Sequence, residues 1–210
     1  MADPTDRDLV RLYWPVQLRP AFDALFAIDD AMTDVVAKAS EPALAAIKLA
    51  WWRERLQELD EGNAPAEPRL QAAARELLPR GISGGELAQL EEGRSAMLHY
   101  PPDGALLAEH GTRLFRIGAK LLNVEFDDRT IGEAGRLFAG IDAARRGLIE
   151  VIPGSAAAGG PRVTRAARPL TALAALAARD LRRGGPPFEP EATPGRALAL
   201  IMHRLTGRIA

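Results

Sequence analysis

The sequence has no cysteine and only three histidines, and these absences remove whole classes of site. Without cysteine the chain can hold no disulfide, thiolate metal site, iron–sulfur cluster or cysteine nucleophile. The histidines, His99, His110 and His203, are too scattered to predict a zinc site. No Walker-type or dinucleotide-binding glycine loop follows a predicted strand, so the sequence does not indicate nucleotide binding.

Long apolar runs are also missing. No stretch approaches the roughly 18 consecutive apolar residues that a membrane span requires. The polar start MADPTDRD lacks the positive-then-apolar order of a signal peptide. We therefore expect a cytoplasmic protein whose contact with a membrane is at most peripheral.

The composition is that of one ordinary globular domain. The 210 residues are 47% hydrophobic and 26% charged, and a single core saturates only near roughly 250 residues. Apolar residues recur at helical spacing from end to end, whereas strand-like alternation is almost absent. The sequence therefore predicts a single all-α domain over residues 1–210, with a flexible loop at about 153–161 and a linker at about 184–193.

Capping residues, prolines and glycines divide the chain into about seven to nine expected helices. Thr5 and Asp8 form a capping-box-like start, and we expect Ser40 and Ser83 to cap two later helices. The expected helices cover about 5–14, 18–39, 40–62, 68–78, 83–99, 103–122, 130–152, 169–181 and 194–206. In such a bundle, binding sites form between facing helices.

The total charge of −1 hides an uneven distribution. Residues 1–142 carry 16 basic and 24 acidic side chains, whereas residues 143–210 carry 11 arginines and four acidic side chains. Guanidinium groups match oxyanions bidentately, so the second region suits phosphate, an anionic lipid or an acidic protein surface. The alternative interpretation is a general preference for arginine over lysine, with internal pairing to the acidic region.

Two aspartates four residues apart are the candidate metal ligands. Asp30 and Asp34 share one face of the helix expected over 18–39. Carboxylates at this spacing suit Mg²⁺, which takes oxygen ligands and often bridges to a substrate phosphate. Both lie beside Asp23 and away from the apolar face, so a solvated helix face is the alternative interpretation.

Three segments carry a family resemblance. The segment RPAFDALFAIDDAMTDVV begins at Arg19, AWWRERL begins at Ala50, and IGEAGRL begins at Ile131. In this order they resemble the R-x-A-x-x-A-x-Y-A-F-x-R-x-x-D-D-I-V-D, WR-x-x-L and LG-x-A-x-Q-L segments of squalene and phytoene synthases. The similarity covers about residues 6–152 and implies the isoprenoid synthase fold, which is an all-α helical bundle.

The resemblance also implies a metal site, and this sequence departs from it. In the family, two DxxxD motifs face each other across a cavity, where Mg²⁺ bridges them to a prenyl diphosphate. Alignment of this sequence places the outer motif positions on Thr33 and Ala37 and on Ala143 and Gly147. All four aspartates are then replaced, which predicts no metal site, no Mg²⁺ cofactor and no metal-assisted ionisation.

The blocks DRDLVRLYWP and SEPALAAIKLAWWRERLQEL look most like the non-catalytic branch of that family. This branch contains a mitochondrial complex I assembly factor and its bacterial relatives. The resemblance implies a non-catalytic binding or assembly-factor scaffold, with a protein partner, an isoprenoid or an anionic lipid as ligand and with no nucleic acid. The alternative is a Mg²⁺-dependent prenyl transferase of isoprenoid biosynthesis, in which Asp30 and Asp34 form a displaced first motif.

Arg145 and Arg146 stand near the position of the second acidic motif, which makes them candidates for binding an anion or a lipid head group. They predict a cavity mouth that is neutral or positive. The alternative interpretation is that both pair internally with acids such as Glu125, Asp127 and Asp128.

Overall fold

The computed structural model describes residues 3–125, 127–150 and 162–209. Within these ranges the regular structure is helical, with no strand and one isolated bridge between Arg162 and Arg208, which confirms the all-α prediction. The α-helices are α1 (Asp6–Arg11), α2 (Arg19–Ala37), α3 (Pro42–Glu58), α4 (Pro68–Glu76), α5 (Gly84–Ala88), α6 (Leu90–Ser95), α7 (Gly104–Leu122), α8 (Asp128–Arg145), α9 (Arg168–Arg182) and α10 (Pro194–Thr206).

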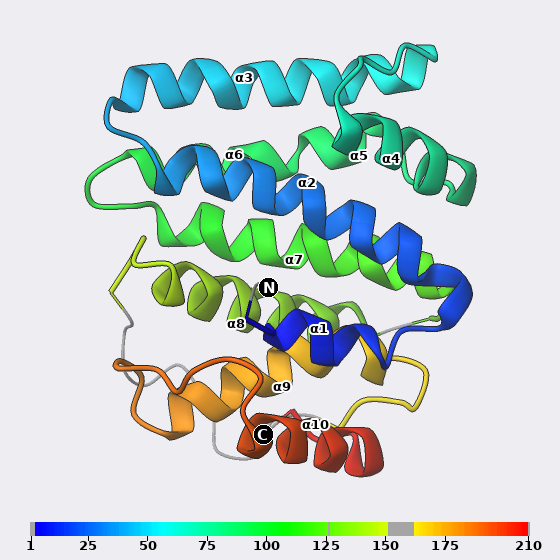
Figure 1. The fold of residues 1–210 in the computed structure, drawn as a ribbon, viewed down its shortest axis with the longest axis vertical. Coiled ribbons are helices and arrows are strands. Elements are labelled where there is room, and N and C mark those ends of the chain that lie inside the picture. Colours follow the sequence, from blue (N-terminus) through cyan, green and yellow to red (C-terminus); the bar gives the residue numbers. More distant parts are fainter. Residues whose placement is uncertain (1–2, 126, 151–161, 210) are drawn as a thin grey trace.

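The helices are stacked along the long axis of the molecule, from α3 at one end to α10 at the other (Figure 1). Near the middle, α7 packs against α6 and against α8, and α8 packs against α9. The first helix, α1, packs against α9 and α10, which lie at the far end of the sequence. The start of the chain therefore helps to hold the C-terminal helices in place.

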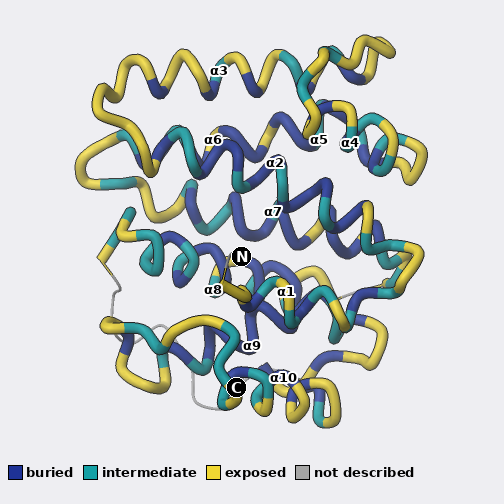
Figure 2. The backbone as a smooth tube through the Cα atoms, viewed as in Figure 1, coloured by how far each residue is buried: buried dark blue, intermediate teal, exposed yellow. Residues whose placement is uncertain are grey.

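Buried apolar side chains from all ten α-helices form one contiguous core. Figure 2 shows these buried positions along the inner sides of the stacked helices. The ring of Trp14 stacks on those of Phe22 and Phe26, with centroids 4.7 and 5.6 Å apart, and so fixes the end of α1 against α2. Trp52 is buried and its neighbour Trp51 is half-exposed, as expected for adjacent residues of one helix.

The α7–α8 crossing depends on two glycines. A Cβ atom on Gly135 would lie 2.1 Å from the carbonyl oxygen of Gly111, and a Cβ atom on Gly111 would lie 2.2 Å from that of Gly135. The two backbones therefore approach more closely than any side chain allows. This contact sets the position of α8, which contributes side chains to the site described below.

Local sequence signals account for most helix boundaries. The Thr5–Asp8 capping box is formed as predicted, and Ser83 forms a second box with Glu86. The prediction for Ser40 is wrong: Glu41 is the N-cap residue of α3 and makes no side-chain capping bond. The helix begins at the following proline, which lacks an N–H and is preset for the first helical turn.

Two other expected helices differ in extent. The helix expected over 83–99 is divided at Gln89 into α5 and α6 and ends in a 3-10 turn. The helix expected over 130–152 begins at Asp128 and ends at Arg145. It ends there because Gly147 adopts a left-handed φ of 71°, and the Leu148 N–H bonds back to the Ala143 carbonyl at 2.9 Å.

The two predicted connections have different outcomes. The loop expected at 153–161 lies outside the described residues. The segment 184–193, where a linker was expected, is non-helical and packs against the helices. Glu189 pairs with Arg179 of α9, and the Arg145 guanidinium of α8 covers the ring of Phe188. Across the described part of the chain, no helix is long and apolar enough to cross a membrane.

Candidate functional site

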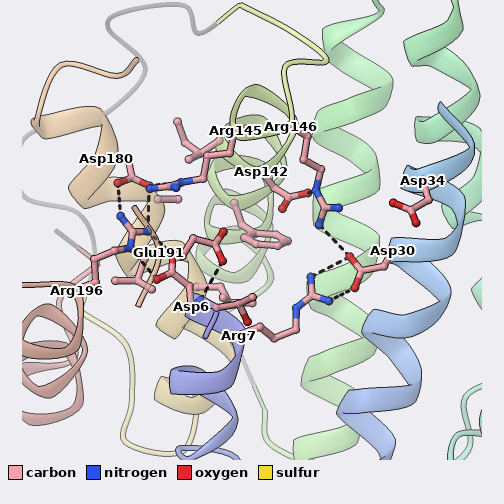
Figure 3. A pocket seen from close by; sticks show the side chains of 16 residues that line it. Asp6, Arg7, Asp30, Asp34, Asp142, Arg145, Arg146, Asp180, Glu191 and Arg196 are labelled. Carbon is pink, nitrogen blue, oxygen red and sulfur yellow. Dashed lines mark hydrogen bonds and ion pairs between the residues drawn. The ribbon is translucent and has the colours of Figure 1, made fainter. Parts of the chain in front are cut away.

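A cavity of about 410 Å³ lies among α1, α2, α8, α9 and the start of α10. Its walls combine apolar side chains such as Phe138 and Leu176 with charged ones (Figure 3). The charged lining residues are Asp6, Arg7, Asp30, Asp34, Asp142, Arg145, Arg146, Asp180, Glu191 and Arg196. This concentration of charge between packed helices makes the cavity the candidate functional site.

One row of alternating charges crosses the cavity between α2 and α8. Asp30 of α2 accepts hydrogen bonds from Arg7 of α1 and from Arg146, whose Nη2 lies 2.9 Å from Asp30 Oδ1. The Nε of Arg146 lies 3.0 Å from Asp142 Oδ2. The order is Arg7, Asp30, Arg146 and Asp142, so each inner group has an opposite charge on both sides (Figure 3).

A second row joins α1, α10, α9 and α8. The Nε of Arg196 donates to both carboxylate oxygens of Asp6 at 2.8 Å, and its Nη1 donates to Asp180 Oδ1 at 2.5 Å. The Nε of Arg145 donates to the other Asp180 oxygen at 2.9 Å. Because Asp6 and Arg7 are neighbours, as are Arg145 and Arg146, the two rows begin and end on the same two helices.

The rows keep their arginines charged. Burial opposes the charge of Arg146, but Asp142 and Asp30 outweigh burial and raise the pKa of its guanidinium. The same balance, with Asp6 and Asp180 as the partners, raises the pKa of Arg196. Both guanidinium groups are therefore fixed cations of the cavity wall.

The charge of the cavity differs from the prediction. The lining holds four arginines and six carboxylates, a formal balance of −2, so the expected neutral or positive mouth is wrong. Arg145 and Arg146 pair internally, but not with Glu125, Asp127 or Asp128. Asp127 caps α8, and Asp128 pairs with Arg116. Neither arginine is left without a carboxylate partner, which leaves little of their charge for an anion.

The structure brings together one set of predicted site residues and separates the other. Asp30 and Asp34 both line the cavity, and Asp34 also pairs with Lys38. The four positions aligned with the family's aspartates do not line it. Thr33 and Ala143 are buried, while Ala37 and Gly147 are exposed near the ends of α2 and α8. None of the four therefore lines this cavity, although the alignment had implied that they would. Gly147 instead lines a separate cavity together with Leu148.

Asp142 is a cavity residue that the sequence reasoning missed. It faces Asp30 and Asp34 from α8, the wall that was expected to offer no acid (Figure 3). The signal was its spacing: Asp30 and Asp34 form a DxxxD pattern, and Asp142 and Arg146 form DxxxR at the same interval. The Asp30–Asp34 pattern begins three residues before the positions aligned with the family on α2, and the Asp142–Arg146 pattern begins one residue before those on α8.

A second ionic cluster lies in the core, away from the cavity. Arg94 of α6 donates through Nη2 to both oxygens of Asp29, at 2.8 and 2.9 Å. The ring of His110 of α7 lies 2.9 Å from Asp29 Oδ1 through Nε2 and 2.9 Å from the Leu90 carbonyl through Nδ1. Burial would raise the pKa of Asp29, but Arg94 and His110 outweigh it and hold that pKa well below its usual range.

The donor set of the cavity does not fit a divalent metal ion. Both oxygens of Asp30 already accept hydrogen bonds from guanidinium groups, and Asp142 is engaged by Arg146. Among the residues whose placement the structure gives, no group of three or more histidine, aspartate or glutamate side chains is arranged to hold a metal ion. A Mg²⁺ ion would have to displace two cations to reach Asp30.

Comparisons with protein-family models, with curated proteins and with solved structures found no match to this chain. The resemblance to squalene and phytoene synthases therefore stays a prediction from the sequence segments quoted above. The arrangement of the cavity is the remaining guide to function.

Proposed function

We propose that this chain is a non-catalytic scaffold related to squalene and phytoene synthases, which binds a protein partner, an isoprenoid or an anionic lipid without turning over a prenyl diphosphate. The resemblance of residues 6–152 supports the relationship, and the all-α bundle agrees with it. The proposal therefore favours a function like that of the assembly-factor branch of the family over the activity of its enzymes.

One observation carries the proposal. The Arg146 guanidinium bridges Asp30 on one wall to Asp142 on the other, at 2.9 and 3.0 Å. In the related synthases, carboxylates of two facing walls are bridged through Mg²⁺. Here a permanent cation of the protein takes that place, and Arg7 adds a second one at Asp30. Without bound metal, ionisation of a diphosphate loses its main electrophilic help.

Prenyl transfer is the second candidate function, because Asp30, Asp34 and Asp142 line one cavity. For that reaction a diphosphate would have to draw Arg7 and Arg146 away from Asp30, so that Mg²⁺ could take their place. The charge-assisted hydrogen bonds of these arginines oppose this exchange. We therefore place it second.

The deciding experiment measures release of diphosphate from farnesyl and geranylgeranyl diphosphate in the presence of Mg²⁺. We expect no release above that of a heat-denatured control, because the cavity offers Mg²⁺ no free pair of carboxylates. Release that disappears in Asp30→Ala would overturn the non-catalytic proposal and establish the second candidate.

A gain-of-binding variant tests the role assigned to Arg146. Arg146→Asp removes the bridging cation and restores a DxxxD pattern on α8, so Mg²⁺ should raise the melting temperature of this variant by several degrees. A ligand stabilises a protein only in proportion to its binding to the native state, so the melting temperature of the unaltered chain should not respond. Arg129→Asp is the matched control, because Arg129 is an exposed arginine of the same helix. An equal response in the unaltered chain would contradict the bridging role.

A further inference from the structure

The outer face of α10 is apolar. Leu198, Ile201, Met202 and Leu205 are between 48% and 69% exposed. Their spacing of three, four and seven residues from the first places them on one side of the helix, and we call them the α10 stripe. The remaining exposed positions of α10 are Pro194 and Arg204, so this surface carries no acidic side chain.

The opposite face of α10 is firmly anchored. Near its start, Arg196 is buried and pairs with Asp6 and Asp180. Near its end, the buried His203 ring lies 2.8 Å from the Arg208 carbonyl through Nδ1 and 3.1 Å from the Thr171 hydroxyl through Nε2. These contacts hold the stripe outward, at the end of the molecule where α10 lies (Figure 1).

Five arginines gather at the C-terminal end of the stripe, and we call them the arginine cluster. They are Arg162, Arg165, Arg168, Arg204 and Arg208. Arg162 forms a backbone bridge with Arg208, and Arg168 Nη1 donates to the Arg204 carbonyl at 2.6 Å. The Arg204 guanidinium lies 5.1 Å from the centre of the Tyr13 ring, which brings the end of α1 beside the cluster.

None of these five arginines lies within ion-pair distance of a carboxylate in the described ranges. The arginines of the cavity, by contrast, all have such partners. Arg168 donates through Nη1 to the carbonyls of Arg204 and Leu205, whereas its buried Nε has no hydrogen-bond partner among the described residues. Its charge has no carboxylate of the described ranges beside it. The cluster is therefore a concentrated positive surface directly beside an exposed apolar one.

We propose that the α10 stripe and the arginine cluster together form a docking surface for an anionic lipid membrane. Interfacial helices lie in the membrane plane with apolar residues inserted and basic residues at the head groups. Leu, Ile and Met side chains would enter the acyl boundary, while the guanidinium groups meet lipid phosphates bidentately. Of the ligands named under the proposed function, this proposal selects anionic lipid and assigns it a binding surface on α10. It does not depend on whether the cavity is catalytic.

The charge of this surface favours a lipid membrane over a second copy of the chain or an acidic protein. In a symmetric dimer through the same face, two arginine clusters would approach each other with no carboxylate on α10 to pair with them, which is unfavourable. An acidic protein would be oriented by directional polar contacts, yet the exposed side chains of α10 offer none besides Arg204. A laterally fluid lipid surface needs only apolar insertion and phosphate.

The test is co-sedimentation of the full chain with vesicles of phosphatidylcholine alone and of phosphatidylcholine mixed with phosphatidylglycerol. We expect retention on the mixed vesicles that falls at high salt, because screening weakens exposed charge interactions. Ile201→Asp/Leu205→Asp should lower the retained fraction through the stripe. Arg204→Glu/Arg208→Glu should lower the affinity by about tenfold or more, because each arginine near an anionic surface contributes measurably.

Matched controls separate this surface from general effects of charge and hydrophobicity. Ile47→Asp alters an exposed apolar residue of α3, at the other end of the molecule. Arg69→Glu/Arg129→Glu changes the net charge as much as the cluster variant does. Both controls should bind like the unaltered chain, as should Arg146→Asp, so vesicle binding and the cavity proposal succeed or fail separately. Circular dichroism verifies that each variant is folded.

Three outcomes would overturn the proposal. One is equal retention on neutral and mixed vesicles, or none on either. Another is unchanged binding by the folded stripe and cluster variants. The third is a dimer in sedimentation velocity that dissociates in Ile201→Asp/Leu205→Asp, which would assign the stripe to a second copy of the chain.

Discussion

Two groups of arginines in this chain lie in opposite surroundings. Arg94, Arg146 and Arg196 are surrounded by helices and held by aspartates. Arg165, Arg204 and Arg208 are exposed at one end of the molecule with no carboxylate of the described chain in ion-pair distance. The first group joins helices to one another, and the second presents its charge to the surroundings.

The comparison shows that arginine content alone says little about function. The sequence marks residues 143–210 as basic, and both groups contribute to that count. The arginines that line the cavity are paired with carboxylates, whereas those of the arginine cluster have no carboxylate within ion-pair distance in the described part of the chain. A functional interpretation of a basic region therefore requires knowledge of which of its charges are already paired.

The largest effect should come from breaking the core ion pair. Arg94→Met leaves the buried Asp29 carboxylate with His110 alone, and removal of one partner of a buried pair costs about 3–5 kcal/mol. Urea denaturation measures the change in the free energy of unfolding. Arg204→Met, which removes an exposed arginine, is the control and should stay within about 0.5 kcal/mol. Equal losses in the two variants would remove the distinction between the groups.

A smaller loss is expected in the cavity. Arg196→Met removes the guanidinium that joins α10 to α1 and α9. Asp180 still accepts a hydrogen bond from Arg145, and Asp6 still accepts one from the Ala192 N–H at 3.0 Å. We therefore expect a loss of about 2–3 kcal/mol in unfolding free energy, in the range for hydrogen bonds to charged groups. A loss as large as that of Arg94→Met would mean that the remaining partners do not compensate.

The decrease of the unfolding free energy at acidic pH should also distinguish the buried, paired arginines from the exposed ones. The pKa of Asp29 is lowered in the folded state, so its contribution is complete above the unfolded value of about 4 and declines as pH falls below it. The slope from one such group approaches about 1.4 kcal/mol per pH unit. Asp29→Asn should have a shallower decline below that pH in urea titrations. An unchanged slope would assign the acid sensitivity to other carboxylates.

The smallest effect is expected at the arginine cluster. Arg165→Ala/Arg208→Ala removes two exposed charges that lack a carboxylate partner among the described residues, so the unfolding free energy should change by less than about 0.5 kcal/mol. Because the substitution also removes repulsion between like charges, the change in unfolding free energy can be stabilising. A clear destabilisation in thermal melts would show that these arginines contribute to the fold, and would weaken their assignment to an external surface.

Local signals account for the parts of the structure that were predicted correctly. Helical periodicity indicated the all-α class, and the Thr5–Asp8 box and the terminal glycines indicated boundaries, because caps form within a few residues. Gly147 was overlooked as a stop signal, which extended α8 in the prediction. The DxxxD pattern at Asp30 was visible in the sequence, but Asp142 was not identified as the residue that faces it from α8.

Local sequence signals could not predict which charged residues pair when they are far apart in the sequence. Arg7 and Asp30 are 23 residues apart, Arg146 and Asp30 are 116 apart, and Arg196 and Asp6 are 190 apart. The helices and their caps follow from neighbours along the chain, since backbone hydrogen bonds and capping bonds are short in sequence. Which aspartate meets which arginine depends on how those helices pack, because the α7–α8 glycine contact and the return of α1 to α9 and α10 place distant residues together.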